Sequence, residues 1–327
     1  MNTYPWFEEN ISAWHKAIEK QHVPHAILLS GSRGIGKIQL AKNMAHIAMC
    51  ENLSPSTVCH SCSSCHLLAA DNHPDLTIIR AEKATILVDQ IRQLSQKVNL
   101  SSTRSQYKVI IIENAHRMNT SAANALLKTL EEPPAKVILI LTTSEIGRLL
   151  PTIKSRCVKT SLRCDDSQQT NHWLAKHTSA PAIDSELSLL IAGNAPLLAL
   201  EILNNSTINA VLTMMDDLVL LKNQQKSVTE VSARWQRNSD YKHLNYCAIL
   251  ILNLIKLQLN LLTQANEHLL KYRNALGTEA KNIKILHNFI DEIFVFMQRL
   301  DTALKTELLT EELLINWQNA FENIKKE

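Results

Sequence analysis

Short apolar runs alternate with segments of helical periodicity over the first half of the chain. The apolar runs that suit a buried strand lie at 25–29, 76–79, 109–112 and 137–141, and a fifth strand is expected within 153–161. Apolar residues recur at helical spacing in 7–22, 38–49, 86–98 and 120–132. This alternation predicts an α/β fold with a parallel sheet covered by helices on both faces.

The second half of the chain has a different character. From Ser167 to the end, the apolar positions follow a helical period, and no glycine occurs between Gly193 and Gly277. A chain of 327 residues has room for two or three domains at about 150 residues each. We therefore expect an α/β domain over 1–162, a small helical domain over 163–206 and a larger helical domain over 207–327.

Charge and cysteine usage narrow the class of protein. The 34 basic and 31 acidic residues leave a net charge of +3 without a run of like charge, which excludes a polycation that coats nucleic acid. The N-terminal stretch MNTYPWFEEN lacks the pattern of a signal peptide, and Asn253 and Lys256 make the apolar stretch 247–262 too polar for a membrane span. We expect a cytoplasmic protein without membrane contact, whose seven cysteines are thiols or metal ligands.

A candidate phosphate-binding loop follows the first predicted strand. It contains Gly31, Gly34, Gly36 and Lys37 in the order G-S-R-G-I-G-K and precedes a predicted helix, which is the context of a P-loop. Backbone N–H groups and the helix N-terminus would surround phosphates, and the lysine would reach the outer ones. The next residue is Ile38, whereas a P-loop that holds Mg²⁺ has a hydroxyl here. The pattern predicts a P-loop fold with weak or absent ATP binding; a glycine turn without a ligand is the alternative.

The residues after the third predicted strand bear on hydrolysis. Many P-loop ATPases have an Asp here for Mg²⁺ and a neighbouring Glu that polarises the attacking water. Glu113 takes the metal position with a longer side chain, and Asn114 takes the position of the base but cannot accept a proton. Together with Ile38, these substitutions predict a degenerate site, in which Asn114 could at most orient a water for slow hydrolysis.

Four of the cysteines crowd into one segment. Cys59, Cys62 and Cys65 are separated by two residues each, and Cys50 precedes them. Structural zinc is held by four tetrahedral thiolates, which closely spaced cysteines can supply. The run also resembles part of an iron–sulfur pattern, but the trailing Cys-Pro is absent and the fourth cysteine lies upstream. We expect a structural zinc module at 50–65 without an open coordination position; four unligated thiols are the alternative.

Several further segments carry a resemblance to a known family. They are His73-Pro74-Asp75, Val88-Asp89-Gln90-Ile91-Arg92, the segment 123–134 (ANALLKTLEEPP) and Ser155-Arg156-Cys157. With the P-loop and the cysteine insert, in this order, they resemble the clamp-loader branch of the AAA+ ATPases, above all the delta-prime family of bacterial DNA polymerase III. The resemblance covers 1–162 strongly, and the helical remainder agrees mainly in length and type.

The resemblance implies a role for Arg156. By composition alone, this residue would be an exposed partner in a salt bridge. In the family, the Ser-Arg-Cys arginine reaches across a subunit interface to the ATP of the neighbouring motor subunit, so Arg156 would be an arginine finger in trans. Active members also carry an arginine in a Gly-x-x-Arg pattern of the lid domain, where this chain has Gly193-Asn194-Ala195-Pro196. Pro196 is thus a further departure from an active ATPase.

The resemblance therefore implies a non-hydrolysing clamp-loader subunit with a helical lid and an all-α collar domain. Its partners would be the motor and delta subunits in a hetero-oligomeric ring and, through the complex, the sliding clamp and primed DNA. One alternative is an ATP-hydrolysing motor subunit, which Ile38, Asn114 and Pro196 oppose. The other is a zinc-containing interaction module without a role in replication, which the segments 123–134 and 155–157 oppose.

Overall fold

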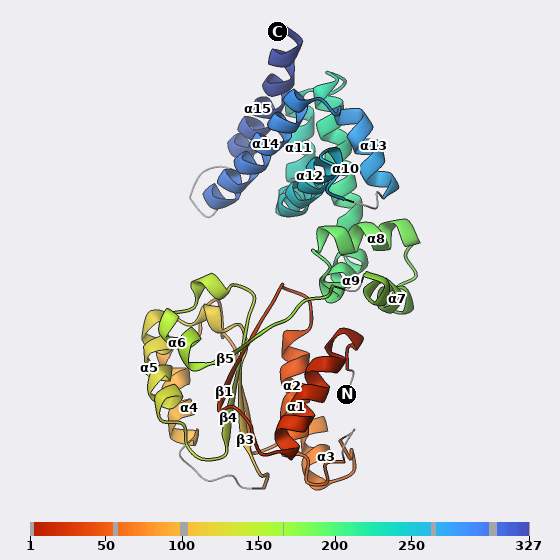
Figure 1. The fold of residues 1–327 in the computed structure, drawn as a ribbon. Coiled ribbons are helices and arrows are strands. Elements are labelled where there is room, and N and C mark those ends of the chain that lie inside the picture. Colours follow the sequence, from red (N-terminus) through yellow and green to blue (C-terminus); the bar gives the residue numbers. More distant parts are fainter. Residues whose placement is uncertain are drawn as a thin grey trace. The chain divides into compact units, whose positions relative to one another are not determined.

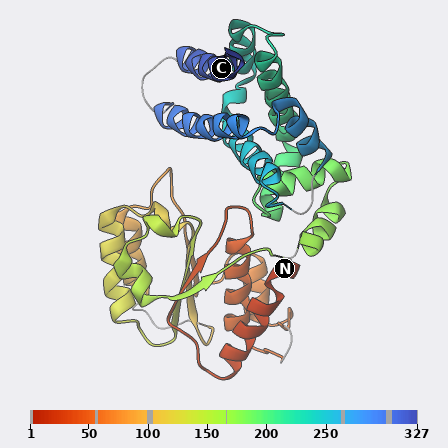
Figure 2. The same cartoon turned by 45° about the horizontal axis from the view of Figure 1, so that its top comes forward.

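The computed structural model describes residues 3–54, 58–98, 104–165, 167–262, 266–300 and 306–326. The chain divides into two compact units, Met1–Gln169 and Thr170–Glu327. The first contains the sheet, and the second is helical (Figures 1 and 2). Each unit has a core of its own, so each is a separate candidate for function.

A parallel sheet forms the centre of the first unit. Its five strands are β1 (Ala26–Ser30), β2 (Leu76–Ile79), β3 (Lys108–Ile112), β4 (Val137–Thr143) and β5 (Val158–Ser161). They lie in the order β2-β3-β4-β1-β5, and every pairing is parallel. The register sets Leu28 of β1 opposite Leu141 on one side and Lys159 on the other. The predicted parallel α/β fold is confirmed, with β3, β4 and β1 inside the sheet and β2 and β5 at its edges.

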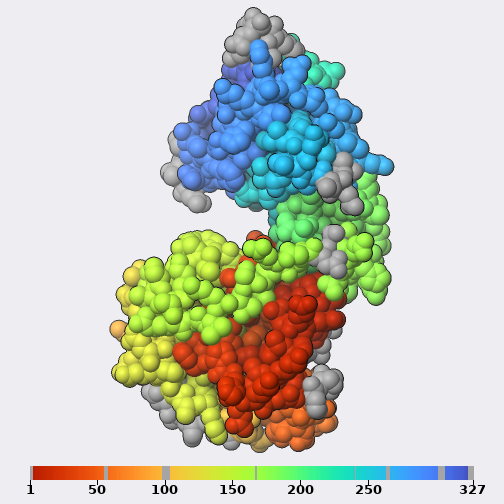
Figure 3. Space-filling model, in the orientation of Figure 1, coloured from red at the N-terminus to blue at the C-terminus, as the bar shows by residue number. Residues whose placement is uncertain are grey.

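Helices cover both faces of this sheet. The helices are α1 (Glu8–Glu19), α2 (Lys37–Met49), α3 (Ser63–Ala69), α4 (Val88–Val98), α5 (Thr120–Glu131) and α6 (Pro151–Arg156), with short 3-10 turns η1 (Pro5–Phe7), η2 (Ala115–Arg117) and η3 (Ile146–Arg148). In both ribbon views α1 and α2 lie on one face and α4 and α5 on the other. Ala122, Leu126 and Leu130 of α5 are buried in a core shared with β1, β3 and β4. The N-terminal segment, red in Figure 3, forms a continuous surface with the yellow-green segment that ends the unit.

The stretch expected to hold a fifth strand contains two elements instead of one. Pro151 begins the short helix α6, where the missing N–H of proline costs nothing, and Ile153 of that helix is fully buried. The strand β5 starts only at Val158 and pairs with β1 alone. The segment of the cysteine insert also contains a helix, α3, that the apolar pattern did not indicate. Its seven residues are too few for a clear periodic signal.

The second unit is built from helices, and its described residues contain no strand. They are α7 (Ser167–His177, which begins at the end of the first unit), α8 (Ala182–Ile191), α9 (Pro196–Asn204), α10 (Thr207–Lys222), α11 (Val228–Asn238), η4 (Asp240–His243), α12 (Leu244–Gln258), α13 (Glu267–Leu276), α14 (Ala280–Arg299) and α15 (Thr306–Lys326). The apolar helix expected at 247–262 is α12, which packs against α10, α13 and α14. None of the described helices is long and apolar enough to cross a membrane.

The core of this unit contains two buried tryptophans. Trp235 donates a hydrogen bond to Asp217 at 2.8 Å, and Trp317 donates one to the carbonyl of Leu218 at 2.8 Å. Phe289 and Phe321 pack on Trp317, with ring centroids 4.4 and 4.9 Å away. The helix α8, inside the expected small domain, also contacts α12 and α13. The division at 206 into a lid and a collar stays a prediction.

Candidate functional site

The glycine-rich loop connects β1 to α2 at the carboxyl end of the sheet. The strand ends at Ser30, and α2 begins at Lys37 with Gly36 as its N-cap. The N–H of Gly31 donates to the carbonyl of Thr143, at the end of the neighbouring strand β4, at 3.2 Å. Ligands of open parallel sheets bind at this edge, in the crevice beyond the carboxyl ends of the strands. The loop thus occupies the position that a nucleotide site requires.

Two glycines of this loop lie where the surrounding chain leaves no room for a side chain. A Cβ on Gly31 would come within 2.6 Å of the carbonyl oxygen of Leu162 and of the Ile35 side chain. Gly36 has a φ of +93°, and a Cβ there would lie 2.6 Å from the ring of Tyr4. Glycine at these positions is therefore explained by backbone conformation and close packing, whether or not a phosphate binds.

Lys37 is folded back onto its own loop. Its Nζ donates to the carbonyl of Gly31 at 2.9 Å and to that of Ser32 at 2.7 Å, and the residue is only 8% exposed. Burial lowers the pKa of this ammonium to about 8, so at pH 7 it remains mostly protonated. An ammonium has three donors, and loop carbonyls take two of them here.

An aromatic cluster from the N-terminal segment packs on the loop. The rings of Tyr4 and Trp6 stack with centroids 4.9 Å apart, and Phe7 meets both edge-on. The indole of Trp6 donates to the carbonyl of Ile35 at 2.9 Å, and Tyr4 lies against Gly36. The sequence analysis missed this cluster, although the run Tyr-Pro-Trp-Phe is a concentration of aromatic residues in a chain with few. The contacts hold the loop from the side of the N-terminus.

The residues after β3 lie near the loop but are engaged with this chain. Glu113 forms an ion pair with Arg80 in which Nε and Oε2 are 2.8 Å apart. Asn114 has a left-handed backbone conformation, with φ of 53°, and its N–H donates to Oγ1 of Thr142 at 3.0 Å. Ile38 is half-buried in the first turn of α2. The sheet order places these residues beside the loop, because β4 alone separates β3 from β1.

His116 is a polar group of this edge that the sequence analysis missed. Its Nδ1 lies 3.0 Å from Oγ1 of Thr143, and its Nε2 lies 3.3 Å from a carboxylate oxygen of Glu145. Burial lowers the pKa of this imidazole, although the charge of Glu145 acts in the opposite direction. The available signal was the position of Thr143 at the end of one buried strand and of His116 in the turn that follows another.

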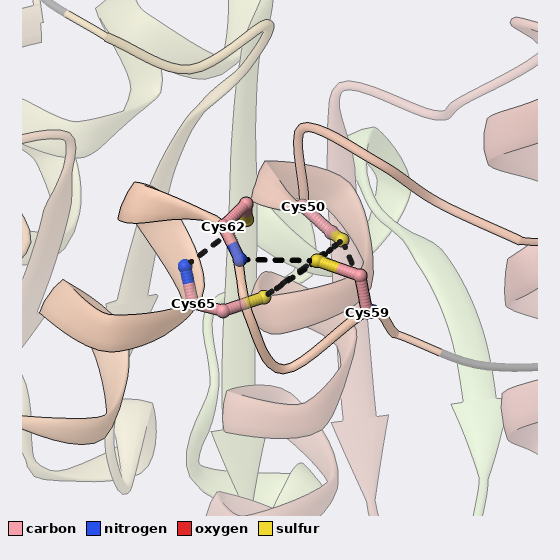
Figure 4. A group of neighbouring side chains, drawn as sticks. All are labelled: Cys50, Cys59, Cys62 and Cys65. Carbon is pink, nitrogen blue, oxygen red and sulfur yellow. Dashed lines mark hydrogen bonds between the residues drawn. The ribbon is translucent and has the colours of Figure 1, made fainter.

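The four cysteines come together at the far end of α2 (Figure 4). Cys50 is the C-cap of α2, Cys62 is the N-cap of α3, and all four Sγ atoms lie within 4.8 Å of one another. Cys59 Sγ lies 3.6 Å from that of Cys50 and 3.8 Å from that of Cys65. The 13 residues of α2 separate the cluster from the loop by about 20 Å along the helix axis.

The donor set fits a tetrahedral zinc ion. Four sulfurs at about 2.3 Å from a metal are about 3.8 Å apart. The Sγ atoms of Cys50, Cys59 and Cys65 match this at 3.6 and 3.8 Å, and that of Cys62 lies within 4.8 Å of them. Backbone N–H groups of Ser61 and Cys62 lower the pKa of the Cys59 thiol to about 5, whereas burial raises the pKa of Cys50 and Cys65. A metal would have to supply the charge that favours the thiolate form of Cys50 and Cys65.

Hydrogen bonds attach the cysteine module to the sheet. Ser64 donates to Glu51 at 2.8 Å through its hydroxyl, which also lies 3.1 Å from Nε2 of His73. Asp75, which is fully buried, accepts from the N–H groups of Arg104 and Ser105 at 2.9 and 3.0 Å. The motif His73-Pro74-Asp75 therefore orients this module and the approach to β3.

Arg156 is the last residue of α6. Its Nη2 forms an ion pair with Glu131, the last residue of α5, at 2.7 Å. Its Nη1 donates to the carbonyl of Thr152 at 3.1 Å and to Oγ of Ser155 at 3.4 Å. The side chain is 36% exposed. The structure thus assembles the predicted loop residues at one edge and the cysteines in one cluster, and it pairs Arg156 with α5.

Comparisons with known proteins cover the part of the chain that contains all three places. A family described as "DNA polymerase III, delta subunit" matches residues 6–166. The delta' subunit of DNA polymerase III of Pseudomonas aeruginosa is 34% identical over 71% of this chain and 71% of its own length. The delta' subunit of Escherichia coli is 31% identical over 61% of this chain and 60% of its own length.

Two further similarities are weaker in coverage or in geometry. The tau subunit of DNA polymerase III of Escherichia coli is 35% identical over 51% of this chain, but over only 26% of its own length. A solved structure of a gamma subunit-related protein from Thermotoga maritima covers 95% of this chain and 99% of that one, with 20% identity and a TM-score of 0.49.

Proposed function

The chain belongs to the family of the delta' subunits of DNA polymerase III, and we propose that within the clamp loader it completes a neighbour's ATP site without hydrolysing ATP itself. A clamp-loader subunit of this family acts in DNA replication. The observation that carries the non-hydrolysing part of the proposal is the contact of Lys37 with its own loop. Lys37, which would have to reach the outer phosphates, is bound to two carbonyls of its own loop instead.

Hydrolysis in cis lacks several parts at once. Ile38 offers no oxygen to Mg²⁺, and Glu113 is neutralised by Arg80 at 2.8 Å. Asn114 cannot act as a base, and Pro196 stands where active relatives have a lid arginine. An ATPase depends on positioning and charge stabilisation by all of these parts together. Their combined loss favours a subunit that holds nucleotide weakly or not at all over the alternative of a motor subunit.

Arg156 is the residue that would act on the neighbour. It ends a short helix that is fixed to the core through Ile153, and a third of its side chain is open to a partner. A guanidinium supplied in trans stabilises the charge that develops on a transferring phosphoryl group, and such fingers contribute about 10³–10⁵ in rate elsewhere. Arg156 would be the catalytic residue that this chain supplies, and it would act in the ATP site of a neighbouring subunit.

Zinc at the cysteine cluster would have a structural role. Four thiolates leave no open coordination position for a substrate, and the cluster joins α2 to α3. Metal binding would fix a segment that has few buried apolar residues of its own. We assign Cys50, Cys59, Cys62 and Cys65 as its ligands.

The remaining parts of the proposal concern the assembly. Residues 163–206 would form the lid and residues 207–327 a collar that joins partner subunits. The partners would be the motor and delta subunits of a cytoplasmic ring, which acts on the sliding clamp and primed DNA. The net charge of +3 is consistent with at most a modest surface that faces DNA.

Two experiments with the isolated chain and its partners test the proposal. The isolated chain should show no ATP hydrolysis above background with or without primed DNA, and it should join motor and delta subunits in one complex on gel filtration. Robust hydrolysis by the isolated chain would favour the motor subunit instead. Failure to join the complex would favour an interaction module outside replication.

A further inference from the structure

The guanidinium of Arg156 is held by two elements of its own chain. Glu131, at the end of α5, binds Nη2 at 2.7 Å, while Thr152 and Ser155 of α6 accept from Nη1 at 3.1 and 3.4 Å. An unrestrained arginine samples many rotamers, and ordering it on a ligand costs free energy. Here that ordering has taken place before any partner binds.

The contacts leave part of the guanidinium available. Arginine has five N–H donors. The two on Nη1 face Thr152 and Ser155, and one of the two on Nη2 faces Glu131. Nε and the second hydrogen of Nη2 have no partner among the described residues, and the side chain is 36% exposed. Two donors suffice for a bidentate contact with a phosphate, so Arg156 can bind one without leaving Glu131.

Both ends of the pair are anchored in one core. Leu126 and Leu130 bury one face of α5, and Ile153 buries α6 beside it. Glu131 is the last residue of α5, because Glu132 leaves the helical conformation ahead of Pro133. The carboxylate therefore has a fixed position relative to Arg156. At 50% exposure it contributes little to the stability of the fold, so its removal should change orientation rather than folding.

We infer that Glu131 is a positioning residue, which holds the Arg156 guanidinium ready for the phosphate of a neighbouring subunit's ATP. This inference rests on the proposed role of Arg156 in trans. Neither the P-loop nor the cysteine cluster contributes to it. The segment 123–134 would thus position Arg156 through Glu131, in addition to packing its apolar face on the sheet.

The test uses Glu131→Gln in the complete complex with motor and delta subunits. The amide has nearly the shape of the carboxylate but no charge, so its oxygen can still accept a hydrogen bond but should hold the guanidinium less tightly. We expect kcat for DNA-stimulated ATP hydrolysis to fall about two- to fivefold, with the KM for ATP unchanged. Glu132→Gln is the matched control, because Glu132 is the adjacent acid and forms no ion pair among the described residues. It should leave kcat unchanged.

A double variant separates this inference from the proposed function. In the Arg156→Ala background, Glu131→Gln should have no further effect, because the residue it positions is gone. Equal kcat for Glu131→Gln and wild type, while Arg156→Ala lowers it, would overturn the positioning role alone. An additional loss in the double variant would overturn it too. If Arg156→Ala itself left the rate unchanged, that result would contradict the proposed role of Arg156 in trans, on which the positioning role of Glu131 rests.

Discussion

Replacing Cys65 by serine should remove the metal from the cysteine cluster. Cys65 is 2% exposed, and its Sγ lies 3.8 Å from those of both Cys50 and Cys59. Structural zinc binds such sets with a free energy on the order of 10 kcal/mol or more. An equal share for each of four thiolates is about 2.5 kcal/mol, or roughly 70-fold in affinity. This is a lower bound, because a neutral hydroxyl is a poor substitute for a thiolate.

The assay is zinc content by mass spectrometry, followed by competition with a chromogenic chelator. Wild type should contain one zinc per chain, and Cys65→Ser should lose it to the chelator at least about 70-fold more readily. Cys164→Ser is the control, because Cys164 is also buried, at 7% exposure, but lies outside the cluster. Hydrogen exchange should speed up in α3 of Cys65→Ser while the amides of β3 stay protected. A variant that keeps one zinc with unchanged affinity would refute the four-thiolate site, and iron with sulfide in wild type would refute zinc.

Two further predictions concern stability. Asp217 is 1% exposed, forms ion pairs with Arg234 and Lys226, and accepts a hydrogen bond from Trp235. Because Asp217→Ala would leave these partners unpaired, it should lower the free energy of unfolding, measured in urea, by about 3–5 kcal/mol. A loss below about 1 kcal/mol would contradict this. Burial lowers the pKa of the His46 imidazole to about 4 in the folded protein, whereas in the unfolded chain it is near 6.5. Between these two values the unfolded chain therefore binds a proton at His46 more readily than the folded protein does. Stability present above pH 6.5 should therefore fall toward pH 4, by about 2 kcal/mol at pH 5. Wild type should lose more than His46→Phe in urea titrations at pH 7 and 5, and equal losses would show that His46 has no such effect.

The inner strands of the sheet could be predicted from the sequence because β1, β3 and β4 are buried on both faces. The run 109–112 is apolar throughout, and the structure buries every one of its residues. The P-loop signature and the spacing of the cysteines are local as well, so the positions of both candidate sites along the chain followed from short segments. The boundary of α5 was visible for the same reason, since Pro133 and Pro134 cannot continue a helix.

What the sequence could not show are contacts between segments far apart. The pairing of Arg80 with Glu113 and that of Glu131 with Arg156 join residues 33 and 25 positions apart, and no periodic pattern encodes them. The closure of Lys37 onto its loop depends on where a buried ammonium finds acceptors. The helix α6 was missed because helix and strand share only about ten residues there, which is less than the window that reveals a period.

The most direct measurement is DNA-stimulated ATP hydrolysis by the reconstituted complex, comparing wild type with Arg156→Ala. Gel filtration of the same samples establishes that both assemble. If Arg156 completes a neighbour's ATP site, the variant complex should form normally and its kcat should fall at least about tenfold. Neither the wild-type chain nor the variant should hydrolyse ATP above background when isolated. An assembled Arg156→Ala complex that hydrolyses ATP at the full rate would contradict the role in trans.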